Sequence, residues 1–133
     1  MIIKLFTMVK NENDIIEHWI KYHGKLFGYE NLYIIDNKSD DGTWEIIQDY
    51  EKMFHINCDQ FDDYKRKGFI MTHLIKNSGY YDFAFPLDID EFIVYYNKEE
   101  NKIYPKKTIK YFESLGKSDE FKENGVFKAN YIQ

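Results

Sequence analysis

The sequence predicts an α/β fold, with a mostly parallel central sheet and helices on both of its faces. The alternation of two sequence patterns supports this prediction. Stretches rich in β-branched and aromatic residues alternate along the chain with stretches whose apolar residues recur near helical spacing. Strands that alternate with helices are joined by crossovers, and such crossovers produce parallel sheets that helices cover on both faces.

The expected elements follow this alternation in order. From their β-forming composition, we expect strands at residues 2–9, 32–35, 54–58, 83–87 with a continuation over 92–96, and 126–132. From the spacing of their apolar residues, we expect helices between the first two strands and at residues 43–53, 64–77 and 108–115.

Short polar residues and glycines mark the ends of the first two helices. Asn11 or Asn13 is a suitable N-cap for the first helix, because its side chain can accept hydrogen bonds from free backbone N–H groups. Gly28 suits the end of that helix, where a residue in the left-handed region is common. Gly42 permits a tight turn before the second helix.

The composition narrows the class of protein. The 133 residues fit one domain, and a hydrophobic content of 44% with 19% aromatic residues excludes a disordered chain. The net charge of −5 argues against nucleic acid as a partner, which would call for a basic face. The single cysteine, Cys58, excludes an internal disulfide framework and a cysteine-rich zinc site. No signal peptide or transmembrane segment is recognisable, so we expect a soluble, cytoplasmic protein.

Polar clusters follow three of the expected strands. They are Lys10, Asn11 and Glu12 after the first strand, Asp36 and Asn37 after the second, and Asp88 and Asp90 after the fourth. Because ligands of parallel α/β sheets bind beyond the carboxyl ends of the strands, all three clusters are expected at one edge, where a site would form.

The pair Asp88 and Asp90 carries the strongest chemical signal. In an extended segment, residues two apart point the same way, so we expect both carboxylates to project together from the end of a buried strand. Two neighbouring carboxylates repel each other unless a proton, water or a cation intervenes, and their hard oxygens suit Mg²⁺ or Mn²⁺. The alternative is that both residues only shape the next turn.

The loop at residues 36–43 is the second signal. A carboxylate at Asp36 can accept hydrogen bonds from a ribose hydroxyl or a base N–H, and Asp41 or Thr43 can cap the next helix. The alternative is a turn whose residues are there for local conformation, because Asp, Asn, Ser and Gly all favour turns. Similarly, Lys65, Arg66 and Lys67 could face a diphosphate, but a solvated helix face explains them as well.

Four segments together resemble one known family. In order they are residues 10–14 (KNEND), 17–20 (EHWI) with Tyr22 and His23, 33–43 (YIIDNKSDDGT) and 87–92 (LDIDEF). This set is similar to the nucleotide-sugar-binding half of family 2-like and family 92-like glycosyltransferases with the GT-A fold, a Rossmann-like fold. The resemblance spans about residues 1–96, and it implies a single GT-A-like domain over 1–133, truncated, with part of the acceptor side at 97–133.

The resemblance also implies roles for individual residues. Asp88 and Asp90 match the family's Asp-x-Asp pair, which binds Mn²⁺ or Mg²⁺ and through it the phosphates of the sugar nucleotide. The nucleoside pocket would be formed by Lys10, Asn11, Glu12 and Asp36, with Asn37 and Asp41 shaping its loop. Trp19 and His23 belong to the pattern too, and we interpret them as packing or structural hydrogen-bonding residues.

The implied reaction is metal-dependent transfer of a sugar from a nucleoside-diphosphate sugar to a hydroxyl acceptor, which is a glycan, a protein or a lipid. Inverting members use a downstream carboxylate as base, and the spacing selects none of the candidates Glu99, Glu100, Glu113, Asp119, Glu120 and Glu123. The catalytic base is therefore unassigned. A partner chain or a second copy of this chain would be one source of the catalytic base and of other acceptor-side elements.

Two other functions stay open. One is a non-catalytic sugar-nucleotide-binding domain, or a remnant of an enzyme, with the same fold and ligand. The other is a phosphotransferase of the haloacid-dehalogenase type, which also places Asp-x-Asp after a strand. That family expects the pair after an early strand and a small hydroxyl residue or Val two positions beyond it, where this chain has Phe92.

Overall fold

The computed structural model describes residues 1–125, which fall into two compact units. The first unit is Met1–Ile93, and the second begins at Val94. The first unit ends three residues before the expected limit of the nucleotide-binding core at residue 96. The strand expected at 126–132 lies outside the described residues. The assignment of 97–133 to an acceptor side stays a prediction.

A four-stranded sheet forms the centre of the first unit. Its strands are β1 (Ile3–Val9), β2 (Leu32–Asp36), β3 (Asn57–Gln60) and β4 (Phe83–Pro86). They lie in the order β3-β2-β1-β4, and every neighbouring pair is parallel. The order reverses between β1 and β4, the kind of place at which parallel α/β sheets bind ligands.

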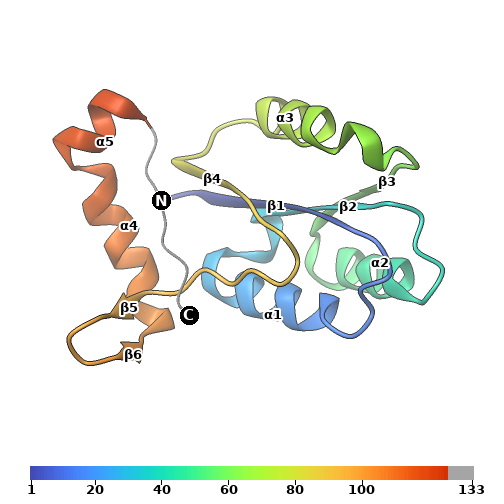
Figure 1. Ribbon diagram of the computed structural model, residues 1–133, viewed down its shortest axis with the longest axis horizontal. Coiled ribbons are helices and arrows are strands. Elements are labelled where there is room, and N and C mark those ends of the chain that lie inside the picture. Colours follow the sequence, from blue (N-terminus) through green and yellow to red (C-terminus); the bar gives the residue numbers. More distant parts are fainter. Residues whose placement is uncertain (126–133) are drawn as a thin grey trace. The chain divides into compact units, whose positions relative to one another are not determined.

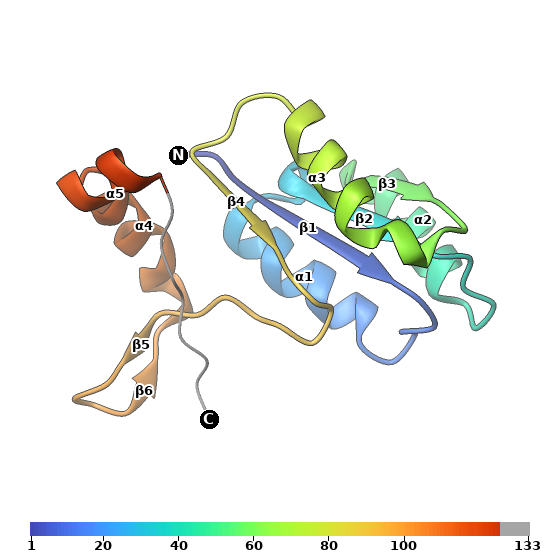
Figure 2. The ribbon, with the colours of Figure 1, turned by 45° about the horizontal axis from the view of Figure 1, so that its top comes forward.

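Helices cover both faces of this sheet. The connections contain α1 (Ile16–Phe27), α2 (Thr43–Phe54) and α3 (Lys67–Asn77), with single 3₁₀ turns at Tyr29–Asn31 and Tyr64–Arg66. Figures 1 and 2 show α1 and α2 on one face and α3 on the other. This is the arrangement that right-handed crossovers impose once the strand order reverses. The predicted fold class is confirmed.

The core of the first unit is built around β1, all seven residues of which are buried. On the α3 face, Phe6 and Met8 pack with Ile35 of β2 and Met71 of α3. Helix α1 turns an apolar stripe inward, and its buried residues are Ile16, Trp19, Ile20, His23, Gly24 and Phe27. A central strand buried on both faces is typical of parallel sheets.

The second unit contains a short antiparallel hairpin and two helices. Its elements are β5 (Tyr96–Asn97), β6 (Lys102–Ile103), a 3₁₀ turn (Pro105–Lys107), α4 (Thr108–Gly116) and α5 (Asp119–Asn124). Helix α5, which we did not predict, is capped by the Ser118 hydroxyl, which accepts a hydrogen bond from the backbone N–H of Phe121. None of the helices in the described part of the chain has the length and apolar character needed to cross a lipid bilayer.

Several boundaries differ from those that the sequence predicted. Helix α2 runs to Phe54, so the third strand starts at Asn57 instead of residue 54. Residues 92–95 are not a strand, and only Tyr96 of the expected 92–96 continuation pairs in a hairpin. Helix α1 begins after Ile15 without a side-chain cap, because Asn11 and Asn13 bond to the neighbouring loop instead.

The two glycines predicted at helix ends both have positive φ, although only Gly42 is in the left-handed helical conformation. Gly28 has φ = 97° directly after α1, and Gly42 has φ = 96° directly before α2. Residues with a side chain rarely adopt such angles, so both positions favour glycine. Gly42 thereby fixes how the chain turns from the end of β2 into α2.

Candidate functional site

A cleft of about 640 Å³ lies at the carboxyl-terminal edge of the sheet. Its lining residues come from the end of β1, from the segments after β1, β2 and β4, and from the start of α3 with the turn before it: Met8, Lys10, Glu12, Asp14, Ile15, Asn37, Tyr64, Lys67, Asp88, Ile89 and Asp90. Five of the predicted site residues are therefore brought together: Lys10, Glu12, Asn37, Asp88 and Asp90. Asn11, Asp36 and Asp41 do not line the cleft.

The loops after β1 and β2 are tied together by reciprocal hydrogen bonds. The backbone N–H of Asn11 donates to the Ser39 hydroxyl at 2.8 Å, and Asn11 Oδ1 accepts from the backbone N–H of Asp40 at 2.9 Å. Asn13 binds Asp41 through both its backbone N–H and its side-chain amide. These bonds set the two loops in register, so Asn11 and Asp41 position the cleft wall without lining it.

Asp36 is fully buried, and donors of the chain itself occupy its carboxylate. Oδ2 accepts hydrogen bonds from the backbone N–H of Ser39 and the side-chain amide of Gln60, both at 2.9 Å, and Oδ1 accepts from the Ser39 hydroxyl at 2.6 Å. The structure thus places Asp36 beneath the loop, where it holds the loop after β2 against β3. The expected contact of Asp36 with a nucleoside stays a prediction.

Asn37, the next residue, does face the cleft. The residue is only 6% exposed, and its Oδ1 has no hydrogen-bond partner within the described part of the chain. A buried acceptor without a partner costs about 1–3 kcal/mol, so native proteins rarely keep one without a reason. Because Oδ1 is itself closed off from solvent, a ligand in the cleft would supply the missing partner only after the amide turns Oδ1 towards the cleft.

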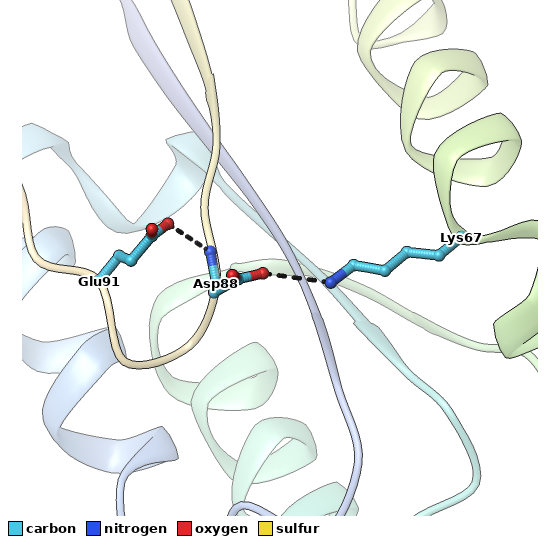
Figure 3. Close-up of polar contacts among 3 residues, drawn as sticks. All are labelled: Lys67, Asp88 and Glu91. Atoms are coloured by element: carbon cyan, nitrogen blue, oxygen red, sulfur yellow. Dashed lines mark hydrogen bonds and ion pairs between the residues drawn. The ribbon is translucent and has the colours of Figure 1, made fainter. Parts of the chain in front are cut away.

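The acidic pair after β4 lies in a turn instead of an extended segment. Strand β4 ends at Pro86, and the backbone N–H of Glu91 donates to the carbonyl oxygen of Asp88 at 3.0 Å. The Glu91 carboxylate in turn accepts from the backbone N–H of Asp88 at 2.8 Å, as Figure 3 shows. The extended geometry that we expected is wrong, because these two bonds close the turn. Asp88 and Asp90 still line the same cleft.

The charges of the cleft are mixed. Four carboxylates (Glu12, Asp14, Asp88 and Asp90) face two ammonium groups (Lys10 and Lys67). Lys67 Nζ lies 3.2 Å from Asp88 Oδ1, and the Asp88 side chain is 65% exposed. Lys10 Nζ donates to the carbonyl oxygen of Lys38 at 3.4 Å.

The donor chemistry of Asp88 and Asp90 fits a magnesium-like ion. Such ions keep several water ligands and take one or two protein carboxylates together with phosphate oxygens of the substrate. Among residues 1–125, no group of three or more His, Cys, Asp or Glu side chains is arranged to hold a metal ion. Asp88 and Asp90 therefore suit a cation whose other ligands are water molecules and phosphate oxygens of a bound substrate. They suit a cation that protein side chains alone coordinate less well.

Three side chains of α1 hold the end of the acidic turn and the residues that follow it. The Trp19 indole N–H donates to the carbonyl oxygen of Glu91 at 3.1 Å, and the Tyr22 hydroxyl donates to that of Ile93 at 2.7 Å. His23 Nε2 accepts from the backbone N–H of Ile93 at 3.3 Å, which leaves Nδ1–H to donate to the Trp19 carbonyl oxygen. Burial lowers the pKa of His23 to about 3, so the ring stays neutral.

Lys67, Tyr64 and Asp14 line the cleft but were not among the predicted site residues. The signal available for the first two was their position, since they follow β3 at the same sheet edge as the other clusters. A helix start after a parallel strand lies at the carboxyl edge, which makes the basic cluster at residues 65–67 more informative than its composition suggests.

Comparisons with known proteins agree with this fold. No protein-family model matches the chain, and no curated protein matches it in sequence. The structure is similar to the crystal structure of S. aureus TarS, a glycosyltransferase, with a TM-score of 0.51 and 18% sequence identity. The similarity covers 74% of this chain and 18% of the TarS chain. At this identity the likeness shows the fold alone, and that fold is glycosyltransferase-like.

Proposed function

We propose that the cleft binds a nucleoside-diphosphate sugar together with Mn²⁺ or Mg²⁺, and that the protein transfers the sugar to a hydroxyl acceptor. One observation carries the proposal. Lys10, Glu12, Asn37, Asp88 and Asp90 come from three strand ends that are far apart in sequence, yet they line one cleft at the switch point of a glycosyltransferase-like sheet.

Each of these residues has a role that its chemistry suits. Asp88 and Asp90 hold the divalent cation, which when bound stabilises the negative charge of the departing nucleoside diphosphate. Asn37, whose side chain lines the cleft, forms a hydrogen bond with the nucleoside through its amide, and Glu12 accepts hydrogen bonds from ribose hydroxyls. Lys10 brings a positive charge to the same cleft, where it attracts the phosphates.

A thermal-shift screen tests this proposal. Sugar nucleotides such as UDP-glucose, UDP-N-acetylglucosamine and GDP-mannose are added with Mn²⁺ or with EDTA. A ligand at ~100 times its Kd stabilises the folded protein by roughly 2.7 kcal/mol, so at least one of them should raise the melting temperature in the presence of Mn²⁺. The proposal fails if none of these sugar nucleotides stabilises the protein under either condition.

A measurement of turnover distinguishes a transferase from a domain that only binds the sugar nucleotide. The similarity covers 18% of the TarS chain, so the activity of that whole protein does not carry over and a binding domain is the second candidate. Both candidates bind the sugar nucleotide, but only a transferase releases free nucleoside diphosphate over time. A coupled assay for that product, run on the ligand found in the screen, distinguishes the two.

A further inference from the structure

Lys67 joins the two sides of the cleft. It is the first residue of α3, and its Nζ lies 3.2 Å from Oδ1 of Asp88, which follows β4. Figure 3 shows the lysine side chain extending from the helix towards the turn. The Lys67 side chain is 33% exposed and that of Asp88 is 65% exposed, so water reaches the pair.

This ion pair contributes little to the stability of the fold. Exposed ion pairs typically stabilise a fold only slightly, because water screens them and both side chains lose freedom. The turn that carries Asp88 is closed by its own bonds with Glu91 and does not need the lysine. A partly exposed pair in a cleft can therefore open when a ligand offers better partners.

A divalent cation at Asp88 would be such a ligand. The cation and the Lys67 ammonium compete for the same carboxylate oxygen, and their like charges repel each other at short range. Lys67 stays tethered to the start of α3, so a displaced ammonium remains beside the cleft. A lysine ammonium is a common phosphate partner, and the amino-terminal end of a helix also favours negative charge.

We propose that Lys67 is a diphosphate-binding residue, which Asp88 keeps as its counter-ion until a divalent cation displaces it. The inference rests on the proposed function, because it concerns the same cleft and the same ligand. It assigns two opposite effects to one side chain. Lys67 weakens the binding of the free cation, and it strengthens the binding of the nucleoside diphosphate once the cation is present.

The test uses Lys67→Met, which removes the charge but keeps a long side chain, and Lys65→Met as the matched control. Lys65 is exposed, lies two residues away and does not line the cleft, so it reports the general effect of losing one positive charge. Binding of Mn²⁺ alone is measured by electron paramagnetic resonance. Binding of UDP and of GDP is measured by calorimetry with saturating Mn²⁺, and circular dichroism checks that each variant is folded.

We expect Lys67→Met to bind Mn²⁺ alone about three- to fivefold more tightly than the wild type, because the competing ammonium is gone. With Mn²⁺ saturating, we expect its affinity for the nucleoside diphosphate to fall about tenfold, the usual scale for one charge-assisted hydrogen bond. Lys65→Met should change neither affinity by more than about twofold.

Four results overturn the inference, and the first three leave the proposed function standing. If the wild type binds UDP or GDP with Mn²⁺ and Lys67→Met binds both ligands as the wild type does, Lys67 has no such role and the proposed function stands. The same holds if Lys67→Met weakens Mn²⁺ and nucleotide binding alike, or if Lys65→Met has the same effects. If the wild type binds neither UDP nor GDP with Mn²⁺, the proposed function and the inference fall together.

Discussion

The indole N–H of Trp19 in α1 donates a 3.1 Å hydrogen bond to the carbonyl oxygen of Glu91, the last residue of the acidic turn. Trp19 itself is fully buried between the helix and the sheet. The bond therefore fixes the turn that carries Asp88 and Asp90 to the most deeply buried helix of the unit. The interpretation of Trp19 as a structural hydrogen-bonding residue is confirmed.

Replacing Trp19 with Phe should loosen the acidic turn without emptying the core. The variant loses one hydrogen bond and some buried volume, so we expect the free energy of unfolding to fall by about 1–3 kcal/mol. Metal-dependent nucleotide binding should weaken as well, because the turn is held less firmly. Urea unfolding and calorimetry measure the two effects, and Trp44→Phe in α2 serves as the control that should leave binding unchanged.

His23 makes the stability of the fold depend on pH. Its pKa is lowered to about 3 in the folded protein, against an ordinary value near 6.5, because the buried ring cannot be hydrated when charged. Between these two values the unfolded chain binds one more proton than the folded chain. The contribution of His23 to the free energy of unfolding is therefore complete above about pH 6.5 and falls as the pH drops towards 3. The free energy of unfolding that is lost through His23 approaches about 1.4 kcal/mol per pH unit.

Chemical denaturation at pH 7, 6 and 5 measures this dependence. His23→Gln should be less stable at pH 7 but should show a flatter decline with acid than the wild type. His18→Gln, at an exposed position in the same helix, should keep the wild-type slope. Equal slopes for His23→Gln and the wild type would show that His23 is not the group responsible.

Replacing Asp36 with Asn should destabilise the loop after β2. The Asp36 carboxylate accepts three hydrogen bonds from Ser39 and Gln60, and an amide nitrogen in its place would face donors. Bonds to a charged acceptor are worth about 1.5–3 kcal/mol each, so we expect a loss of at least about 2 kcal/mol in urea unfolding. Asp40→Asn, at an exposed position of the same loop, is the matched control. Equal losses in both variants would contradict a specific role of Asp36.

Replacing Asn37 with Leu should separate stability from binding. The change removes a buried acceptor that has no partner in the described residues, so the free energy of unfolding should stay unchanged or rise by about 1 kcal/mol. Nucleotide affinity should fall about tenfold, because the ligand loses a hydrogen bond in a buried position. A variant that loses stability and keeps its affinity would contradict the binding role of Asn37.

The sequence was sufficient to predict the parallel sheet and the edge at which the cleft lies. The pattern of β1 and the polar residues after β1, β2 and β4 are local features, and parallel strands bring their carboxyl ends together. Glycine readily adopts positive φ, and on that basis the sequence correctly placed Gly28 and Gly42 at the ends of helices. These predictions succeeded because each depends on neighbouring residues or on a rule of topology.

The roles of single side chains were harder to predict because they depend on distant partners. Asp36 could equally bind a ligand or hold its loop, and Gln60 on β3, 24 residues away, completes its hydrogen bonds. Lys67 meets Asp88 across 21 residues, a contact that no local pattern shows. The turn at Asp88 did have a local signal, because a Glu three residues after a polar residue often bonds back to its N–H.

The central claim is that Asp88 and Asp90 bind a divalent cation that in turn binds the diphosphate of a nucleotide. Calorimetry with UDP and GDP, in Mn²⁺ and in EDTA, tests it most directly on the wild type, Asp88→Asn and Asp90→Asn, with Asp62→Asn at an exposed position as control. We predict that Mn²⁺ raises the affinity of the wild type and of Asp62→Asn about tenfold or more, and that neither site variant keeps this gain. Wild-type gains in both Asp88→Asn and Asp90→Asn would contradict the claim.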